Sequence, residues 1–459
     1  MDTPSSPEQQ LARFVTAQPL AGIPAHALLT TRRVLLAAIG TGIAGAGEDG
    51  IEQLRALLLE RGGAPQARSL VFGDRLPAVS AAQLNGTMCR ALDFCDAMAP
   101  GIHIGSSLVP AALAAAELAG GCSGSEFLAA LAVGCELGAR FNLTEAMYDG
   151  FDPTGVAIVF AATAAAARVL RLDEKQALNA LGLAFNRCGG SFQSNIDGTL
   201  AVRMVQGWVA AIGVECAQMA QRGITGPSRF LTGIYGYAHL YGRGRLQPSE
   251  VVEGLAAEWR LDRMMFKKYP SCGATQGLTE LTLGLVQELA LQPGDVERVE
   301  VRLNPYCHRL VGHPFEMGDN PRVNAQFSVQ YCVANAIVRG SSRLPHFRPE
   351  AVADPSVHAL LRRVHAIGDP ALDARGHTAV DVTLATRDGR VHERRLDIAP
   401  GYPGNGLSEE QHVARFRDCM AYAARPLAPE QVASFLARVE DVAALPDARV
   451  LLEDLVARG

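Results

Sequence analysis

Lysine is the rarest charged residue of this chain. Only Lys175, Lys267 and Lys268 stand against 39 arginines, because lysine and arginine together number 42. Two of the three are adjacent in residues 266–273, which read FKKYPSCG. An ammonium group is a compact charge whose pKa falls readily on burial, whereas a guanidinium stays charged and binds through a planar fork. The adjacent pair is therefore either a solvated turn, since most lysines are exposed, or a site that needs an ammonium group.

The cysteines lack the spacing of a metal site or a disulfide framework. Ten of them run from Cys89 to Cys419, and no two form a C-x-x-C pair or a clustered set of His and Cys ligands. This usage is typical of reduced, mostly buried thiols in a cytoplasm. We therefore expect no metal, no iron–sulfur cluster and no other cofactor.

Signals for secretion, membranes and nucleic acids are also lacking. The first ten residues, MDTPSSPEQQ, have no basic segment followed by an apolar one, as a signal peptide would. A long uncharged run, residues 97–115, contains two prolines and a histidine and is a poor membrane span. A net charge of −5 with scattered basic residues gives no reason to expect nucleic acid. We expect a soluble cytoplasmic protein without a membrane or nucleic-acid partner.

Alanine-rich segments dominate the first 265 or so residues and show no strand-like alternation. A chain of this length is expected to form two or more domains with substantial cores. Ser123 and Asp173 fit N-cap positions before apolar runs. Helices are predicted at residues 28–44, 106–119, 125–143, 155–170 and 173–185. The segment 155–170 is apolar nearly all round, which indicates a helix enclosed by other helices.

The pattern changes after about residue 270. Apolar residues there alternate with charged ones, as in a half-buried strand, and Arg387-Asp-Gly-Arg390 supplies a hairpin turn. Strands are predicted at residues 299–303, 380–384 and 391–398, and helices at 325–340 and 355–367. This region is predicted to be a smaller α+β domain.

A Gly/Pro-rich stretch, residues 399–406, precedes two more helical segments at 408–424 and 429–443. The predicted fold is therefore mainly α. A large all-helical domain is built from both chain ends, residues 1–268 and 401–459, and a smaller α+β domain of residues 269–400 is inserted. A cleft between domains is where ligand pockets are often found, and Lys267 and Lys268 lie at the predicted crossing.

Two carboxylates and a histidine precede the predicted helix at residues 106–119. Asp93, Asp96 and His103 lie close to its first turn, where free N–H groups attract anions and a histidine can exchange protons near neutral pH. On a helix, Asp93 and Asp96 would share a face because they are three residues apart. The alternative is that both carboxylates cap turns and His103 is an ordinary loop residue.

Three further segments carry polar residues with two possible roles. Asp152 begins a predicted helix and either caps it or faces the cleft. Arg203 and Gln206 share a helical face, and an arginine opposite Lys267 would suit a polycarboxylate, although arginines more often pair with a protein acid. Tyr331 either faces a ligand or packs in the core with its hydroxyl bonded to backbone.

Motifs for several common reactions are lacking. The sequence has no Ser-His-Asp motif, no G-x-G-x-x-G after a strand and no P-loop. Acid/base residues and cations remain, which is the equipment for making or breaking C–H bonds beside a carboxylate.

Six segments, in their order along the chain, resemble the MmgE/PrpD family of polycarboxylate dehydratases, decarboxylases and epimerases. They are residues 85–96, 150–155, 223–227, 266–273, 325–331 and 403–408. Each segment is weak alone, but the ordered set is specific, and the likeness extends from about residue 10 to the end. The resemblance implies a helical domain with an inserted α+β lid, and a homodimer.

The resemblance also implies the residues of the pocket between domain and lid. The predicted catalytic residues are His103, Asp93, Lys267 and Tyr331, and the predicted substrate-binding residues are Lys268, Arg203, Asp152, Ser106, Cys272 and Gln276. The chain departs from the family pattern at Asp152 and Gln276, where many relatives have histidine, and at Ala211, where a basic residue is common and Arg203 is a possible substitute. These departures predict a substrate with fewer or differently placed carboxylates.

The predicted function is that of a cofactor-independent lyase acting on a small di- or tricarboxylate, with dehydration of a 2-methylcitrate-like hydroxy acid as the leading case. His103, oriented by Asp93, is the predicted proton carrier. Lys267, with Lys268 or Arg203, is predicted to stabilise the enediolate, and Tyr331 to bond to the substrate or deliver a proton. The alternatives are decarboxylation or epimerisation of a related polycarboxylate, and a relative that binds carboxylates without catalysis.

Overall fold

The structure is a computed structural model that describes residues 5–458, and it divides into two compact units. The first, here called the helical unit, comprises the described part of Met1–Ala91, Cys95–Met264 and Cys419–Gly459. The second, the α+β unit, comprises Leu92–Phe94 and Met265–Asp418. The α+β unit thus ends at residue 418, whereas the sequence predicts an end at residue 400. It also includes residues 92–94, which are remote in sequence from its main segment.

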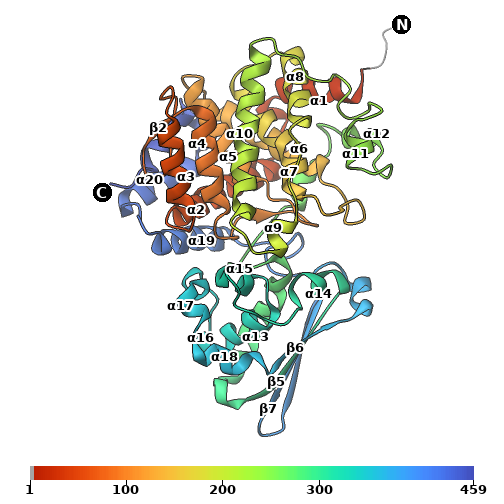
Figure 1. Ribbon diagram of the computed structural model, residues 1–459, viewed down its shortest axis with the longest axis vertical. Helices are drawn as coiled ribbons and strands as arrows, with labels where there is room; N and C mark the ends of the chain where they lie inside the picture. Colours follow the sequence, from red (N-terminus) through yellow and green to blue (C-terminus); the bar gives the residue numbers. More distant parts are fainter. Residues whose placement is uncertain (1–4, 459) are drawn as a thin grey trace. The chain divides into compact units, whose positions relative to one another are not determined.

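The helical unit is built almost entirely from helices (Figure 1). Its helices are α1 (Pro7–Ala17), α2 (Ala25–Gly45), α3 (Ile51–Arg61), α4 (Ala78–Arg90), α5 (Gly105–Leu118), α6 (Gly124–Phe141), α7 (Pro153–Val169), α8 (Glu174–Phe185), α9 (Gln193–Ile196), α10 (Ala201–Gln221), α11 (Tyr237–Leu240), α12 (Pro248–Val252) and α20 (Pro429–Glu440). The helix α19 (Glu409–Tyr422) runs through the boundary at residue 418. Short strands β1 (Ala67–Arg68) and β2 (Arg75–Leu76) pair antiparallel, and β3 spans Asp96–Ala97.

Helix α7 forms the centre of this unit. All 17 of its residues are buried, and it packs against α5, α6, α8 and α10. Small residues permit the close packing: a Cβ on Gly213 of α10 would lie 2.7 Å from the backbone of Ala162 on α7. The prediction of an enclosed, small-residue helix at this position is confirmed.

The predicted capping residues also act as expected. The Ser123 hydroxyl accepts a hydrogen bond from the backbone N–H of Glu126 at the start of α6. The Asp173 carboxylate accepts one from the backbone of Gln176, whose side chain accepts one from the Asp173 N–H in return. Each cap pairs N–H groups that a helix start would otherwise leave without partners.

One described helix, α2, is long and apolar enough to cross a membrane by length and composition. Its most apolar window is 72% buried by the protein itself, which is the usual condition of a core helix. The sequence of α2 is therefore explained by packing inside the helical unit.

The α+β unit contains a four-stranded sheet in the order β6-β5-β7-β8. Strand β5 (Val296–Leu303) pairs parallel with β6 (Val364–Gly368) and antiparallel with β7 (Val380–Thr386). Strand β7 continues through the predicted hairpin into β8 (Val391–Leu396). The remaining elements are β4 (Met265–Phe266), α13 (Gln276–Leu289), α14 (Pro305–Val311), α15 (Pro321–Gln326), α16 (Val329–Arg339), α17 (Pro349–Val352) and α18 (Pro355–Leu361).

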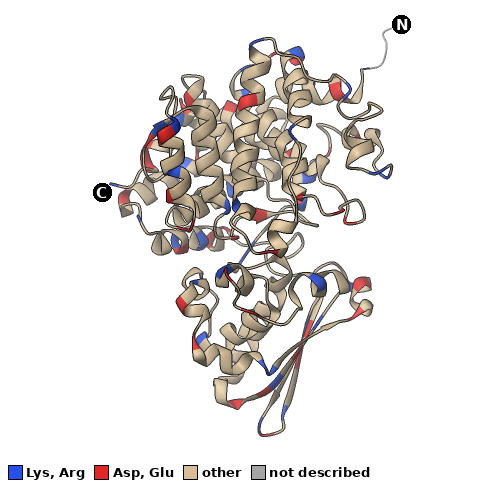
Figure 2. Ribbon diagram, in the orientation of Figure 1, with Lys and Arg blue, Asp and Glu red and all other residues tan. Residues whose placement is uncertain are grey.

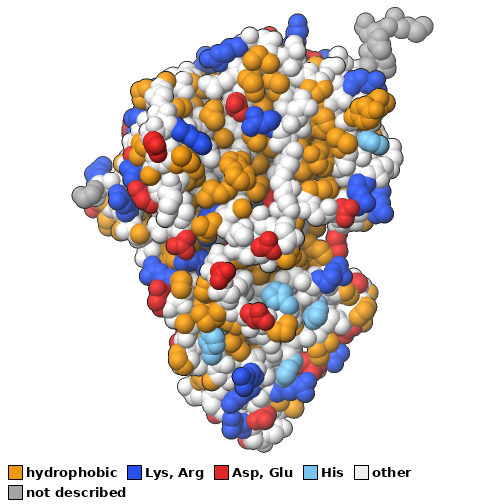
Figure 3. All heavy atoms as spheres, viewed as in Figure 1, with side chains coloured by type: hydrophobic (Ala, Val, Ile, Leu, Met, Phe, Trp, Pro, Cys, Tyr) orange, Lys and Arg blue, Asp and Glu red, His pale blue; other side chains and the backbone are white. Residues whose placement is uncertain are grey.

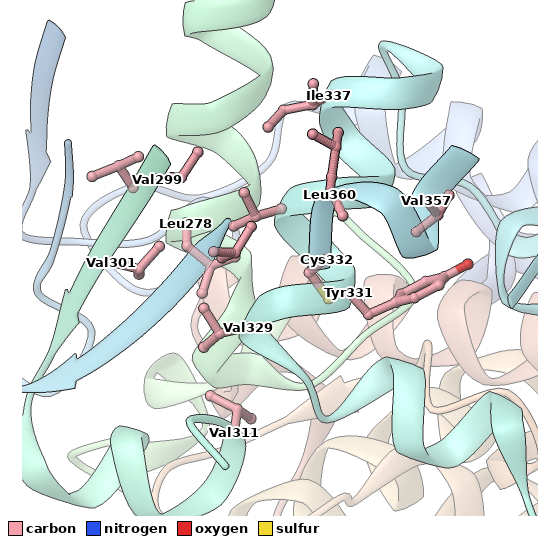
Figure 4. Close-up of a cluster of buried hydrophobic side chains, with 14 of the residues drawn as sticks. Leu278, Val299, Val301, Val311, Val329, Tyr331, Cys332, Ile337, Val357 and Leu360 are labelled. Atoms are coloured by element: carbon pink, nitrogen blue, oxygen red, sulfur yellow. The ribbon is translucent and has the colours of Figure 1, made fainter. Parts of the chain in front are cut away.

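Cross-strand pairs build the core of this sheet. Val299 lies opposite Leu384, and Val301 opposite Val382, and all four are buried. Together with residues of α13, α16 and α18 they form one apolar cluster (Figure 4). The alternation in the sequence is therefore the signature of strands with one face on a core.

Two predictions in this unit need correction. The predicted helix at residues 355–367 ends at Leu361, and Val364–Gly368 forms strand β6 instead. The predicted helix at residues 325–340 is broken at Phe327, and Ser328 caps a new helix by accepting a hydrogen bond from Tyr331 N–H. Tertiary pairing with β5 explains the first difference, and a serine that competes with helix continuation explains the second.

Candidate active site

The loop after α4 carries the predicted carboxylates, and they do not share a helical face. Helix α4 ends at Arg90, and Asp93 has a left-handed backbone with φ of 50°. Asp96 accepts hydrogen bonds from the backbone of Ile104 and Gly105 at 2.9 and 3.0 Å, and so caps α5. A Cβ on Gly105 would collide with that carboxylate, which explains why glycine stands there. Asp96 therefore fits the capping alternative.

His103 is held in the helical unit by its neighbours. Its Nδ1 lies 2.7 Å from the Asp96 backbone oxygen and 3.5 Å from the Cys95 sulfur. Its backbone N–H donates to the Thr154 hydroxyl at 3.2 Å. Because a carbonyl oxygen only accepts, the Nδ1 contact requires a proton on Nδ1, which makes Nε2 the basic nitrogen of the neutral ring. These contacts assign the orientation of the ring to Asp96, and the predicted orienting role of Asp93 stays a prediction.

Asp152 lies beside this histidine segment, two residues before Thr154. It is buried and caps α7, with one carboxylate oxygen 2.9 Å from the Gly155 N–H. Burial raises the pKa of Asp152, while the Gly155 hydrogen bond and the charge of Arg90 act in the opposite direction. The capping alternative accounts for Asp152, and a contact with substrate stays a prediction.

The other two predicted residues of the helical unit are buried and bonded to backbone. Arg203 donates to the Asp49 backbone oxygen at 2.8 Å. The Ser106 hydroxyl lies 3.4 Å from the Cys89 backbone oxygen. Each of these contacts is internal to the helical unit, and the predicted binding roles are untested.

Lys267 and Asp93 form a buried ion pair in the α+β unit. The ammonium nitrogen lies 2.7 Å from the Asp93 Oδ2 and donates to the Asp93 backbone oxygen at 3.0 Å. The two side chains are only 3% and 6% exposed. Desolvating such a pair is costly, and removing one partner leaves a buried charge without compensation. This is the most demanding electrostatic arrangement among the predicted residues.

Two residues that sequence reasoning did not single out hold the backbone around Asp93. Gln326 donates through Nε2 to the Leu92 oxygen at 2.7 Å and to the Pro270 oxygen at 2.9 Å. Arg415 donates to the Phe94 oxygen at 2.7 Å, and its guanidinium stacks 4.5 Å from the Phe94 ring centre. Gln326 lies in residues 325–331, one of the segments on which the family resemblance rests. No local sequence pattern indicates a role for Arg415.

Lys268 has a different environment from its neighbour. Its ammonium lies 2.7 Å from the Glu280 Oε2, and the Tyr269 hydroxyl donates to the same oxygen at 2.5 Å. The side chains of Lys268 and Glu280 are 29% and 36% exposed, so water competes for this pair. Burial, followed by the charge of Glu280, raises the pKa of Tyr269.

Gln276 organises the loop that follows Lys268. Its Oε1 accepts from the Tyr269 N–H at 2.9 Å, and its Nε2 donates to the backbone oxygens of Tyr269, Ser271 and Cys272 at 3.0 to 3.3 Å. Cys272 is buried at the turn. The amide of Gln276 thus has a structural role, and contacts of Gln276 and Cys272 with substrate stay predictions.

Tyr331 is fully buried in the apolar cluster of the α+β unit. Figure 4 shows its ring at the end of the cluster, with the hydroxyl directed away from Val329 and Cys332. That hydroxyl donates to the backbone oxygen of His346. Burial raises the pKa of Tyr331. The core-packing alternative describes this residue, and we assign it no step in the chemistry.

Two family models match the chain in the order of its two regions. The model described as the MmgE/PrpD N-terminal domain matches residues 9–248, and the one described as the MmgE/PrpD C-terminal domain matches residues 269–438. The chain belongs to the MmgE/PrpD family.

Two activities are named among relatives in this family. Cis-aconitate decarboxylase of Mus musculus is 26% identical over 92% of this chain and 87% of its own length. The Homo sapiens decarboxylase is 26% identical over 83% of this chain and 81% of its own length. The 2-methylcitrate dehydratase of Escherichia coli is 23% identical over 56% of this chain and 55% of its own length. These relatives are lyases of two kinds, and their identities with this chain do not distinguish between the two reactions.

Two further observations concern metal ligands and basic residues among the described residues. Within residues 5–458, no group of three or more His, Cys, Asp or Glu is arranged to hold a metal ion. Figure 2 shows basic residues scattered along the chain without a continuous stripe. His103 belongs to the helical unit and Lys267 to the α+β unit, so their action on one substrate is a proposal, taken up next.

Proposed function

We propose that this MmgE/PrpD protein is a cofactor-independent lyase of a small di- or tricarboxylate, and that it dehydrates a 2-methylcitrate-like hydroxy acid. Membership in the family and the activities of its relatives support the reaction class. The observation that carries the proposal is the buried Lys267–Asp93 pair. Lys267 is one of only three lysines, and it is buried, where a charge is costly because it is desolvated. A cation in such an environment suits the stabilisation of a developing anion.

In the proposed reaction, Nε2 of His103 removes a proton from a carbon beside a substrate carboxylate. The electron pair of the broken C–H bond moves toward that carboxylate as an enediolate, and Lys267 stabilises the negative charge. The pair then forms a C=C bond as the β-hydroxyl leaves. The imidazolium returns its proton to the leaving oxygen, so that water departs and the ring is neutral again.

The contacts around these two residues suit their proposed tasks. The proton on Nδ1 of His103 is fixed by the Asp96 backbone oxygen, which keeps Nε2 as the base. Asp93 Oδ2 lies 2.7 Å from the Lys267 nitrogen, so the buried ammonium group has a carboxylate partner. Gln326 and Arg415 hold the carbonyls on either side of Asp93, so that the pair has a defined geometry.

Decarboxylation is the second candidate. The mouse cis-aconitate decarboxylase aligns with 92% of this chain, whereas the Escherichia coli dehydratase aligns with 56%. In this version the C–C bond to one carboxylate breaks and CO₂ leaves. Lys267 stabilises the same kind of carbanion, and protonated His103 delivers the proton to carbon. One proton carrier and one cation serve either reaction.

The test is to incubate the purified protein with hydroxy and unsaturated di- and tricarboxylates and to follow products by mass spectrometry. Loss of water identifies dehydration, loss of CO₂ identifies decarboxylation, and unchanged mass with altered chirality identifies epimerisation. The matched control is the Lys267→Met variant. Turnover of a compound by the wild type and its loss in the variant supports the proposal. Ligand-induced thermal stabilisation without turnover of any compound would contradict it.

A further inference from the structure

Three helices of the helical unit end around a depression in its surface. The volume of this depression is about 360 Å³, within the range of roughly 300–1,000 Å³ that is typical of ligand pockets. Its polar lining consists of Arg171, Gln218, Gln221 and Arg222. The rest of the lining is apolar and comes from the last residues of α5 and α7 and the positions that follow them. We call this depression the helix-end pocket.

The helix-end pocket lies apart from the candidate active site. Two of its helices begin beside residues of that site, because His103 precedes α5 and Asp152 caps α7. The pocket is at the opposite ends of both helices, and the 17 residues of α7 span about 25 Å at roughly 1.5 Å per residue. Figure 1 places the C-terminal end of α10 at the top of the view, and Figure 3 shows basic side chains there. A ligand of this pocket would therefore contact neither His103 nor Asp152.

The pocket carries positive charge without a facing carboxylate. Arg171 and Arg222 are both exposed, and none of the described residues that line the pocket is acidic. The acids close to the lining in sequence have other partners. Glu117 and Glu215 pair with other arginines at 2.7 and 2.9 Å, and the Asp173 carboxylate caps α8. The two guanidinium charges are therefore not neutralised within the pocket.

Helix capping explains Arg222 but not Arg171. Arg222 donates to the Gln218 backbone oxygen at 3.0 Å, which is a usual contact of a basic residue at a helix end. Arg171 follows α7 with a left-handed φ of 57°, a conformation that favours glycine or asparagine. Its side chain forms no hydrogen bond or ion pair with any residue between 5 and 458. The fold thus leaves the Arg171 guanidinium without a task of its own.

The carbonyl groups at these helix ends already have donors. The C-terminal end of a helix carries partial negative charge, which attracts cations and opposes an anion. Here the Leu170 oxygen accepts from the Gln221 side chain at 3.2 Å, and the Gln221 oxygen accepts from the Gln176 side chain at 3.3 Å. Arg171 is therefore not needed to satisfy these oxygens and is available to a ligand.

We propose that the helix-end pocket binds a small organic anion, a phosphate ester or a polycarboxylate, through Arg171 and Arg222. A guanidinium donates two parallel N–H groups to the paired oxygens of either group. The apolar ends of α5 and α7 suit the carbon skeleton of such a molecule. The pocket lies wholly within the helical unit, and this assignment does not depend on the reaction proposed above.

The first test measures the binding of glycerol 3-phosphate and of citrate by isothermal titration calorimetry, one compound for each kind of anion. The wild type is expected to bind at least one of them with a dissociation constant of about 1 mM or lower. In Arg171→Asn, which suits the left-handed backbone, the affinity should fall by at least roughly tenfold. The matched control is Arg229→Asn, because Arg229 is an exposed arginine of the same unit outside the pocket.

Three results would overturn the proposal. The first is a wild type that binds neither compound, and the second is an Arg171→Asn variant with wild-type affinity. The third is an equal loss of affinity in Arg171→Asn and Arg229→Asn, which would indicate a general effect of net charge. If binding depends on Arg171 alone, the tighter of the two compounds identifies the kind of anion.

A second measurement locates the bound anion, because the proposed substrate is itself a polycarboxylate. Hydrogen exchange of the wild type, followed by mass spectrometry, should slow in residues 166–176 and 216–224 when the bound compound is added. Slowing confined to the segments around His103 or Lys267 would overturn the proposal. This measurement needs no variant, so it remains decisive if Arg171→Asn folds poorly.

Discussion

Lys267 and Lys268 are neighbours in the chain, but their surroundings differ in the two properties that decide what an ammonium group does. Lys267 is 3% exposed and faces the Asp93 carboxylate from an element 174 residues away. Lys268 is 29% exposed and pairs with Glu280, twelve residues along the chain. A buried charge acts strongly on anything that enters its environment, whereas a solvated one is screened. In the proposed mechanism, this comparison favours Lys267 over Lys268 as the ammonium group that acts on the substrate.

Replacing Lys267 should have the largest effect. In Lys267→Met, the loss of the proposed anion stabiliser should lower kcat/KM by roughly 10²–10³-fold. The unpaired Asp93 should also lower the free energy of unfolding by about 3–5 kcal/mol. Lys267→Arg should not restore turnover, because a planar fork does not fit the place of a point charge. The measurement is kcat/KM on the acid that the protein converts. A wild-type value in Lys267→Met would show that Lys267 does not act on the substrate.

Replacing His103 tests the proposed proton carrier, which lies in the helical unit. His103→Ala should lower kcat by roughly 10²–10⁴-fold with little change in urea unfolding. The control is His239→Ala, because His239 is an exposed histidine of the same unit. Equal turnover in the two variants would remove His103 from the mechanism.

Asp152 should give a smaller effect that depends on pH. Asp152→Ala removes the cap of α7 and should cost about 1 kcal/mol, whereas Asp152→Asn keeps a capping oxygen. Because burial raises the pKa of Asp152 above 3.8, the folded state binds this proton more tightly than the unfolded state. The stabilisation of the folded state by that proton is fully present below pH 3.8. It is lost as the pH rises through the folded-state pKa of Asp152. The free energy of unfolding should be measured for the wild type and for Asp152→Asn at pH 4 and pH 7. Relative to the wild type, the stability of Asp152→Asn should be higher at pH 7 than at pH 4. A constant difference would contradict the assignment.

Lys268 should give the smallest effect. Its pair with Glu280 is more than a quarter exposed, so Lys268→Met should cost about 1 kcal/mol or less. Turnover should change by less than about tenfold, which corresponds to 1.4 kcal/mol. A loss of activity equal to that of Lys267→Met would show that both ammonium groups act on the substrate.

The helices were predictable because their signals are local. Alanine-rich segments, the Ser123 and Asp173 caps and the alternation around Val301 each act within a few residues. Strand β6 was missed because its signal is not local: Val364–Gly368 is short, follows a helix directly, and becomes a strand by pairing with β5. Tertiary contacts override propensity in such segments.

The candidate site was only partly predictable for the same reason. Sequence spacing placed Asp93 with Asp96 on one helical face, but the helix ends at Arg90 and Asp93 turns into a left-handed conformation. Its actual partner, Lys267, is remote in sequence, and so are Gln326 and Arg415, which hold its neighbours. No periodicity encodes contacts across more than 150 residues. The scarcity of lysine identified one member of the pair without revealing the other.

The most direct test of the account is the double variant Asp93→Asn/Lys267→Met, because asparagine removes the charge and tolerates the left-handed backbone of residue 93. Removing both charges of a buried ion pair is often neutral for stability, whereas removing one is not. The double variant should therefore unfold within about 1 kcal/mol of the wild type and yet turn over its substrate at least roughly 10²-fold more slowly. A double variant with wild-type stability and wild-type turnover would show that the pair is structural, and would contradict the central claim.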